Sequence, residues 1–412
     1  MLLNRLWIGL FLIALFLGLY KLLFLNDLLI FKEIVEALFT SAKNAFELAL
    51  YLTGALCLWL GIMEIGEKGG AVKILSKFFK PFFTKLFPEI PENHSAHGSI
   101  MMNFSANMLG LDNAATPLGL KAMNQLQELN PDKKTASNAQ IMFLVLNTSG
   151  LTVIPVSILA YRTAAGSNSP NEVFLPILIS TFVATLVGLI GVSIRQKINL
   201  FQPIILTYLG SMVLGISLLL IWLYHYPQYI DPVSNVGGNL LLFSVICFFI
   251  LLGIRSKINV YDSFIEGAKG GFSVAIKIVP YLVAILVAIG VFRASGAMDF
   301  LLIGLKNLFN LIGLVSTEFI DALPTAIMKP FSGGAARGMM LETFNTHGVD
   351  SFVAKLAATF QGSTETTFYV LALYFGSVGI TKTRYATGYG LLADLAGIIT
   401  AIFMAYLFYS TT

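Results

Sequence analysis

Long apolar runs constrain this chain more than any other feature of its sequence. Each has close to the roughly 20 residues that a helix needs to cross a bilayer. Clear examples are Leu6–Leu25, Phe46–Gly66, Val173–Ile194, Pro203–Tyr224 and Val236–Ile254. Only 12% of the 412 residues are charged, against about 25% in an ordinary soluble domain. We therefore expect an all-α polytopic membrane protein whose first partner is the lipid bilayer.

The net charge of +4 is small for this length, so we expect no nucleic-acid partner. The sequence leaves open whether the chain forms a homo-oligomer. It contains no Walker motif, which argues against an ATP-driven pump within this chain.

The lysines and arginines predict the orientation in the membrane. Two basic connectors, Arg195–Gln202 and Arg255–Asp262, flank a pair of apolar runs joined by HYPQYIDPVSN, which has no Lys or Arg. Short loops rich in these residues stay in the cytoplasm. Both connectors are therefore predicted inside and the joining segment outside. Counting spans from the connectors predicts a bacterial inner (cytoplasmic) membrane protein with its N-terminus cytoplasmic and its C-terminus outside.

The second half of the sequence is similar to the first. Phe46 aligns with Phe272, and at a slightly shorter spacing NTSGLT from Asn147 aligns with QGSTET from Gln361. The first copy is predicted to begin outside and the second inside, so the two copies are inverted repeats, as in many secondary transporters. The predicted segments are an N-terminal transmembrane helix (1–30), a first repeat (31–194), a two-helix linker hairpin (195–259) and a second repeat (260–412).

Each repeat is predicted to hold an interfacial helix, a re-entrant helical hairpin and a broken transmembrane helix. In the first copy AVKILSKFFKPFFTKLF (71–87) interleaves lysines with phenylalanines, which suits a helix lying in the inner interface. The polar stretch NFSANMLGLDNAATPLGLKAM (103–123) has both ends inside and is too short for two spans. We therefore expect a hairpin that turns near Asp112 and Asn113. Its polar side chains, the amides of Asn103, Asn107 and Asn113 and the carboxylate of Asp112, are expected either to satisfy freed backbone groups or to contact a substrate.

The second hairpin is predicted in DALPTAIMKPFSGGAARGMMLETF (321–344), which enters from the outside. We expect its first helix to be broken by Pro324 and Pro330 and its turn to lie at Ser332-Gly333-Gly334. The helix after each hairpin is interrupted by small polar residues, in NTSGLTVIP and in QGSTETTFY. Unwound helices of this kind present backbone groups to ions and substrates.

Substrate-binding residues are expected on the hairpins and at the helix interruptions. Irregular backbone at membrane depth survives only where it is buried in protein or lines a wet cavity, and charges there mark function. The candidates are Asn107, Asp112, Asn113, Thr116, Asn147, Ser149, Thr152, Lys329, Ser332, Arg337, Gln361, Ser363, Thr364, Glu365 and Thr366.

Two carboxylates are candidates for proton or cation coupling, Glu365 and Asp394. Glu365 is expected at the middle of a helix, where a proton, a cation or a nearby base must neutralise it. Asp394 is either such a coupling site or the partner of a buried base such as Arg337. Glu92, His94 and His97 have the spacing of a metal site, but a polar loop before a hairpin explains them better, and we expect no metal or cofactor.

Two long motifs resemble a known family. SANMLGLDNAATPLGLKAM (105–123) is similar to the signature of spore maturation protein A, and PTAIMKPFSGGAARGMM (324–340) with QGSTETTFYVLALYFGSVGI (361–380) to that of spore maturation protein B. The resemblance covers residues 31–194 and 260–412, so the chain looks like a natural fusion of the two. Both belong to the nucleoside-recognition or Gate domain family, which also appears in the ferrous-iron permease and resembles parts of concentrative nucleoside transporters. The resemblance implies a membrane function and leaves the substrate open.

We predict a secondary transporter or permease of a small polar solute or ion, such as a nucleoside-like compound, an amino acid, an amine or a cation. One alternative is a non-transporting scaffold or receptor in envelope or spore maturation. Another is an intramembrane enzyme that uses Asp112 with Glu365 or Asp394 for acid–base chemistry. The sequence lacks a nucleophile and base at a recognisable spacing, so we do not expect an enzyme.

Overall fold

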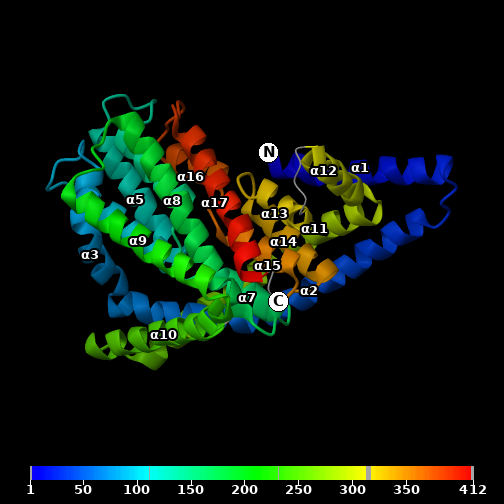
Figure 1. Ribbon diagram of the computed structural model, residues 1–412, viewed down its shortest axis with the longest axis horizontal. Coiled ribbons are helices and arrows are strands. Elements are labelled where there is room, and N and C mark those ends of the chain that lie inside the picture. Colours follow the sequence, from blue (N-terminus) through cyan, green and yellow to red (C-terminus); the bar gives the residue numbers. More distant parts are fainter. Residues whose placement is uncertain (1, 111, 231, 312–316, 410–412) are drawn as a thin grey trace. The chain divides into compact units, whose positions relative to one another are not determined.

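The computed structural model of the protein describes residues 2–110, 112–230, 232–311 and 317–409 (Figure 1). Within these ranges the chain is almost entirely helical and forms no β-strand. Among the described residues, seven helical stretches are long and apolar enough to cross a membrane: Trp7–Phe24, Ile30–Gly69, Pro170–Gln196, Pro203–His225, Gly238–Arg255, Val260–Ala294 and Ala386–Tyr409. The predicted all-α, multi-pass membrane class is confirmed.

The order of helices in the first half recurs in the second. The first half contains α1 (Leu2–Phe24), α2 (Ile30–Gly69), α3 (Ala71–Leu86), α4 (Ser95–Met108), α5 (Asp112–Leu129), α6 (Asn138–Ser149), α7 (Val156–Ala164), the short η1 (Pro170–Val173) and α8 (Phe174–Gln196). The linker contains α9 (Pro203–His225), η2 (Pro227–Tyr229), η3 (Pro232–Gly237) and α10 (Gly238–Arg255). The second half contains α11 (Val260–Ala294), α12 (Ala297–Leu311), η4 (Glu318–Ala322), α13 (Leu323–Met328), α14 (Gly333–His347), α15 (Phe352–Gly362), α16 (Thr367–Ser377) and α17 (Ala386–Tyr409).

Both halves thus run from one long helix through a short helix, a hairpin pair and a broken pair to a second long helix (Figure 1). The interruptions predicted at NTSGLTVIP and QGSTETTFY separate α6 from α7 and α15 from α16. The opposite membrane orientation of the two copies, and the boundaries of the predicted segments, stay predictions.

Contacts divide the chain into two compact units. Unit 1 consists of residues 1–59, 157–170 and 268–361, and unit 2 of residues 60–156, 171–267 and 362–412. The division falls at both helix breaks, so that α6 and α16 belong to unit 2 whereas α7 and nearly all of α15 belong to unit 1. Each hairpin lies wholly within one unit.

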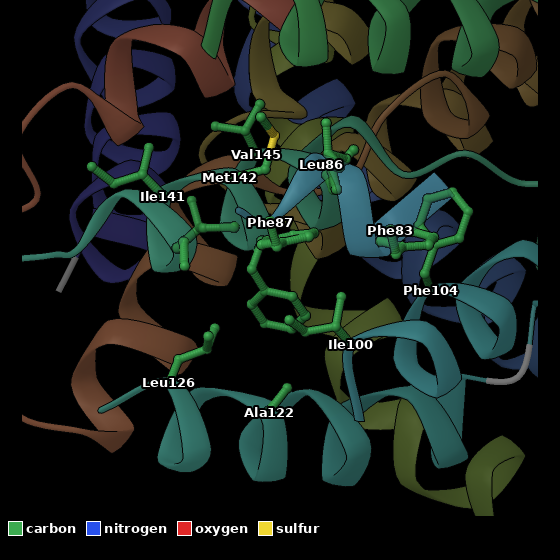
Figure 2. Close-up of a cluster of buried hydrophobic side chains, with 14 of the residues drawn as sticks. Phe83, Leu86, Phe87, Ile100, Phe104, Ala122, Leu126, Ile141, Met142 and Val145 are labelled. Atoms are coloured by element: carbon green, nitrogen blue, oxygen red, sulfur yellow. The ribbon is translucent and has the colours of Figure 1, made fainter. Parts of the chain in front are cut away.

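Unit 2 has a core of aromatic and aliphatic side chains (Figure 2). The buried face of α3 packs on α4, where the ring of Phe104 lies 4.9 Å from that of Phe83 and 5.7 Å from that of Phe79. This face follows from the spacing of apolar residues in AVKILSKFFKPFFTKL at three and four residues, which places them on one side of a helix. Helices α6, α8 and α17 pack together in the same unit.

Hairpin 1, formed by α4 and α5, belongs to unit 2. Its turn lies at Leu109 and Gly110, before the predicted position, because α5 already begins at Asp112. Gly110 has a φ of 70°, a left-handed conformation that glycine adopts without strain. A Cβ at Gly110 would also lie 2.7 Å from the carbonyl oxygen of Ile154. The predicted turn was therefore placed too late in the sequence, and the glycine was the better signal.

Hairpin 2, formed by α13 and α14, belongs to unit 1. Pro324 lies in the first turn of α13 and does not break the helix. The N–H groups of a first turn have no partner within the helix, so the missing N–H of proline costs nothing there. Ser332 caps α14, its Oγ accepting a hydrogen bond of 3.2 Å from the amide of Ala335. The glycines after Ser332 form the first turn of α14, so the reversal lies at residues 329–332 and the predicted turn at 332–334 was misplaced.

Candidate functional site at the helix breaks

The first helix break begins at Gly150, which ends α6 in a left-handed conformation with a φ of 57°. The hydroxyl of Ser149 donates to the carbonyl of Leu146, and that of Thr152 donates 2.8 Å to the carbonyl of Gly150. Side-chain hydrogen bonds of this kind compete with the helical pattern. Pro155 then lacks an N–H for a continuing helix, and α7 starts at the next residue.

The second helix break lies beside the first within unit 2. Helix α15 ends at Gly362 and α16 begins at Thr367. Between them the amide of Glu365 donates a hydrogen bond of 2.8 Å to the carbonyl oxygen of Thr148. A Cβ at Gly150 would lie 3.0 Å from Cγ of Glu365, so a larger residue at Gly150 would push the two segments apart.

Hairpin 1 joins the same cluster. The carbonyl of Met108, at the end of α4, accepts 2.8 Å from the amide of Val153 in the first break. The side-chain amide of Asn107 donates 2.9 Å to Oδ1 of Asn147, whose own amide donates to the carbonyl of Phe143. Three irregular segments therefore meet in unit 2: the turn of hairpin 1 and both helix breaks.

Glu365 differs from its prediction. It is not part of a helix, because its amide bonds across to the first break, and its side chain is exposed. Its neighbours Ser363, Thr364 and Thr366 are buried, with 0%, 3% and 6% of their surface exposed. Oγ1 of Thr364 has no hydrogen-bond partner in the described part of the chain. The carboxylate that was expected at the middle of a helix instead lies exposed on unwound backbone.

Asp394 is a buried carboxylate of unit 2, with 2% of its surface exposed. It accepts a hydrogen bond of 2.7 Å from the hydroxyl of Thr367, which sequence reasoning missed. Two glycines let α17 approach the second break: a Cβ at Gly390 would lie 2.9 Å from Cγ2 of Thr367, and one at Gly397 would lie 3.2 Å from the carbonyl of Ser363. The spacing Gly390, Asp394, Gly397 places all three on one helix face and was the available signal.

Other candidates of hairpin 1 are distributed as follows. The side-chain amide of Asn103 donates 2.8 Å to the carbonyl of Ala115 on α5, and lies 3.4 Å from the hydroxyl of Tyr374. Thr116 is half-buried on α5. The side chains of Asp112 and Asn113 lie outside the described part of the structure, so their predicted roles stay predictions.

Four candidates lie in unit 1. Ser332 caps α14, and the amide of Gln361 lies 3.4 Å from the carbonyl of Gly333. Lys329 is buried, with 5% of its surface exposed. Arg337 stacks its guanidinium on the ring of Tyr161, 5.1 Å from the ring centre. Because the two hairpins belong to different units, the predicted cavity shared by their turns stays a prediction.

The polar loop before hairpin 1 has a structural role. Nδ1 of His94 accepts a hydrogen bond of 3.2 Å from the amide of Ala96 and so caps α4. Among the described residues, no three His, Cys, Asp or Glu side chains are grouped as metal ligands would be.

Comparison with known proteins supports both motifs read from the sequence. A family model named Gate and described as nucleoside recognition matches residues 49–167 and 275–381, more than half of the chain. The starts of the two matches have the same spacing in the sequence as Phe46 and Phe272. Their ends have the same spacing as Asn147 and Gln361. The family matches therefore follow the internal alignment of the two halves.

Two curated relatives are similar to large parts of the chain. Spore maturation protein B of Bacillus subtilis (strain 168) is 45% identical over 167 residues, which are 40% of this chain and 92% of the relative. Spore maturation protein A of the same organism is 42% identical over 153 residues, which are 37% of this chain and 78% of the relative. The resemblance drawn from the hairpin and break motifs is confirmed.

Proposed function

The chain belongs to the Gate family of nucleoside-recognition proteins, and we propose that it is a membrane permease for a small polar solute or ion. The observation that carries the proposal is the pairing of the two helix breaks through the amide of Glu365 and the carbonyl of Thr148. Transporters of inverted-repeat architecture bind their substrates at such discontinuous helices.

The chemistry at the breaks supports a polar ligand. The break segments carry hydroxyl groups, backbone groups outside helices and one exposed carboxylate, that of Glu365. Asp394 is buried and accepts a hydrogen bond from Thr367, the residue that directly follows the second helix break. Neutral donors and acceptors with a single negative charge suit a nucleoside-like compound, an amine or a cation better than an anion.

The proposal assigns binding and conformational change to these residues, and no catalytic step. Glu365 is the residue proposed to contact the solute, whereas Asn107 and Asn147 position the break. Spore maturation is the setting that the names of the two relatives support.

Ligand-induced thermal stabilisation of the purified full-length protein tests the proposal. Nucleosides, amino acids, amines and metal ions are screened one class at a time, and stabilising compounds are then tested for uptake into proteoliposomes. A charge-assisted hydrogen bond contributes about 1.5–3 kcal/mol, so Glu365→Gln should weaken binding about tenfold or more. Glu92→Gln, which alters another exposed glutamate of unit 2, should bind as the wild type does.

Two results would count against the proposal. Equal affinity of the Glu365→Gln and Glu92→Gln variants would remove Glu365 from the site. Stabilisation by none of the four classes, together with no uptake, would favour the scaffold or receptor alternative.

We also propose that the N-terminus lies in the cytoplasm and the C-terminus outside. In a background with Cys57 and Cys247 replaced by alanine, a membrane-impermeant thiol reagent added outside should label a cysteine at Gln228 and spare one at Lys257. Both positions are exposed, and they flank α10 in the sequence. The reverse pattern would overturn the orientation.

A further inference from the structure

Helix α3 presents three different faces along one short amphipathic stretch. The first face is buried in the core of unit 2 and includes Phe83 and Leu86 (Figure 2). Phe79 is buried on the same face. The hydroxyl of Tyr208 on α9 also donates 2.7 Å to the carbonyl of Phe78. The helix is therefore fixed in rotation, and its other two faces have a defined direction.

The second face is a lysine stripe formed by Lys73, Lys77 and Lys80. These residues are spaced by four and three positions, so they lie above one another on one side of a helix. All three are exposed, and none forms an ion pair with the described residues. Lys85 adds a further exposed charge in the last turn, and α3 contains no acidic residue.

The third face is an apolar stripe formed by Ile74, Phe78 and Pro81. Each of its residues directly follows one of the lysine stripe, so it runs parallel to that stripe, about a quarter-turn away around the helix. Ile74 and Phe78 are 49% and 59% exposed, and Pro81 is exposed as well. A positive stripe beside an exposed apolar stripe is the pattern of a helix lying in the headgroup region of a membrane.

The corresponding helix of the second half lacks this pattern. Helix α12 carries one acidic residue, Asp299, and one lysine, Lys306, which forms an ion pair of 2.9 Å with Asp321. Several of its large apolar side chains are exposed, among them Phe300 and Ile303. Both helices suit an interface, but only α3 has an unpaired positive stripe.

We propose that the lysine stripe of α3 binds the head groups of anionic phospholipids in the cytoplasmic leaflet. The negative surface of that leaflet attracts basic segments, while the apolar stripe inserts beside the acyl chains. The charge difference between α3 and α12 follows if only α3 faces the anionic leaflet. Because α3 packs on α4 through Phe79, Phe83 and Phe104, bound lipid also steadies the first helix of hairpin 1.

The test uses the purified full-length protein in a neutral detergent, titrated with phosphatidylglycerol or phosphatidylcholine. Native mass spectrometry counts the lipids retained. The wild type should retain phosphatidylglycerol in preference, and added salt should weaken this preference. Lys73→Gln/Lys77→Gln/Lys80→Gln should lose about fivefold in phosphatidylglycerol affinity for each lysine, about a hundredfold in all, with phosphatidylcholine binding unchanged.

Matched variants separate the stripe from general charge. The triple Arg variant at the same positions should keep the preference, because the charge is kept. Lys73→Gln/Lys77→Gln should lose the preference for phosphatidylglycerol. Lys32→Gln/Lys43→Gln, which removes two exposed lysines of α2, should keep this preference. If the triple Gln variant does not fold, Lys77→Gln alone should still show about a fivefold loss.

Three outcomes would overturn the proposal. The first is an unchanged preference for phosphatidylglycerol in the triple Gln variant. The second is an equal loss in the Lys32→Gln/Lys43→Gln control. The third is retention of a soluble polyanion such as heparin that phosphatidylglycerol does not displace, which would assign the stripe to a nucleic-acid-like or protein partner.

Discussion

The two hairpins have the same form but satisfy their polar groups by different means. Hairpin 1 uses neutral amides: Asn103 bonds to its own second helix, and Asn107 bonds to α6. Hairpin 2 lies among charges. Arg293 pairs with Glu342 of α14 at 2.9 Å, and Arg337 stacks on Tyr161.

One kind of contact is common to both hairpins: a hydrogen bond of a side-chain amide, called an amide tie below, joins each hairpin to the broken helix that follows it. Asn147 in α6 and Gln361 in α15 occupy equivalent positions in the two copies, each in the last turn before a helix break. Asn147 accepts a hydrogen bond from Asn107 of hairpin 1, and Gln361 donates to the carbonyl of Gly333 in hairpin 2. The repeat therefore keeps an amide that fastens each broken helix to its hairpin and varies the charge around it.

The largest effect is expected from removing a charge in unit 1. Arg162 is fully buried; its guanidinium forms an ion pair of 2.9 Å with Asp350 and donates to the carbonyls of Val349 and Pro170. A hydrogen bond to a charged group contributes about 1.5–3 kcal/mol, and Arg162→Met removes several at once, so it should sharply lower the melting temperature in detergent.

The matched change in unit 2 is Gln196→Met. Gln196 donates to the carbonyl of Asn138 and to the hydroxyl of Tyr385, both neutral groups. Its replacement should cost about 1 kcal/mol. Equal losses of melting temperature in the two variants would contradict the view that the buried guanidinium of Arg162 stabilises its unit more than the neutral amide of Gln196 stabilises the other.

A smaller effect is expected where hairpin 1 packs on α16. A Cβ at Gly119 would lie 2.6 Å from Cε1 of Tyr374, closer than non-bonded carbons approach. Gly119→Ala should therefore destabilise unit 2 by about 1–3 kcal/mol, measured as thermal unfolding. Tyr374→Leu, which removes the ring, should relieve the added loss in a double variant. Additive losses would show that Gly119 is required for another reason.

Much of this fold could be predicted from the sequence, because membrane spans depend on length and hydropathy alone. The run predicted at Val173–Ile194 corresponds to α8, and both helix breaks fell on the small polar stretches beside Asn147 and Gln361. The hairpin turns were misplaced because Asp112-Asn113 and Ser332-Gly333-Gly334 were taken as turn residues, whereas α5 begins at Asp112 and α14 at Gly333. Pro324 begins a helix, and the reversal of hairpin 1 depends on the positive φ of Gly110.

The site was harder to predict, since its contacts join segments far apart in the sequence. Glu365 was expected inside a helix because an apolar run follows it in the sequence. The hydrogen bond from its amide reaches Thr148 in the other half of the chain and leaves no local signal. The roles of Thr367 and Tyr374 likewise depend on partners in other helices, although Gly390 and Gly397 marked the face of α17 that approaches the break.

The two amide ties should also differ in strength. Both polar atoms of the Asn147 side chain are bonded, at 2.9 Å each. The bond from Gln361 is 3.4 Å long, and its buried Oε1 has no partner among the described residues. A double-mutant cycle with Asn107→Ala and Asn147→Ala should give a coupling of about 1 kcal/mol in thermal unfolding. Gln361→Ala should cost less than Asn147→Ala, and the opposite order would contradict the assigned ties.

The smallest effect is expected in the pH dependence of stability. One loop aspartate in each unit, Asp350 in unit 1 and Asp132 in unit 2, can be used to measure it. Burial raises the pKa of Asp350. Hydrogen bonds from the Ser167 hydroxyl and the Asn168 amide, together with the charge of Arg162, lower it by more than burial raises it, so the pKa lies below its ordinary value. The pKa of the fully exposed Asp132 is lowered by the hydroxyl of Thr135 and then by the amide of Lys134.

A carboxyl group whose pKa is lower in the folded state stabilises the fold at pH values above its pKa in the unfolded state, which is about 3.9 for aspartate. This stabilisation is lost as the pH falls through the pKa of the folded state. The melting temperature should therefore show no pH dependence from either group between about pH 5 and 8. Below about pH 4 the difference between the wild type and Asp350→Asn should narrow. Asp132→Asn should follow the wild-type profile closely, since an exposed carboxylate is well solvated in both states. If the difference in melting temperature between the wild type and Asp132→Asn narrowed more than that for Asp350→Asn, Asp132 would stabilise its unit more than Asp350 does, against this prediction.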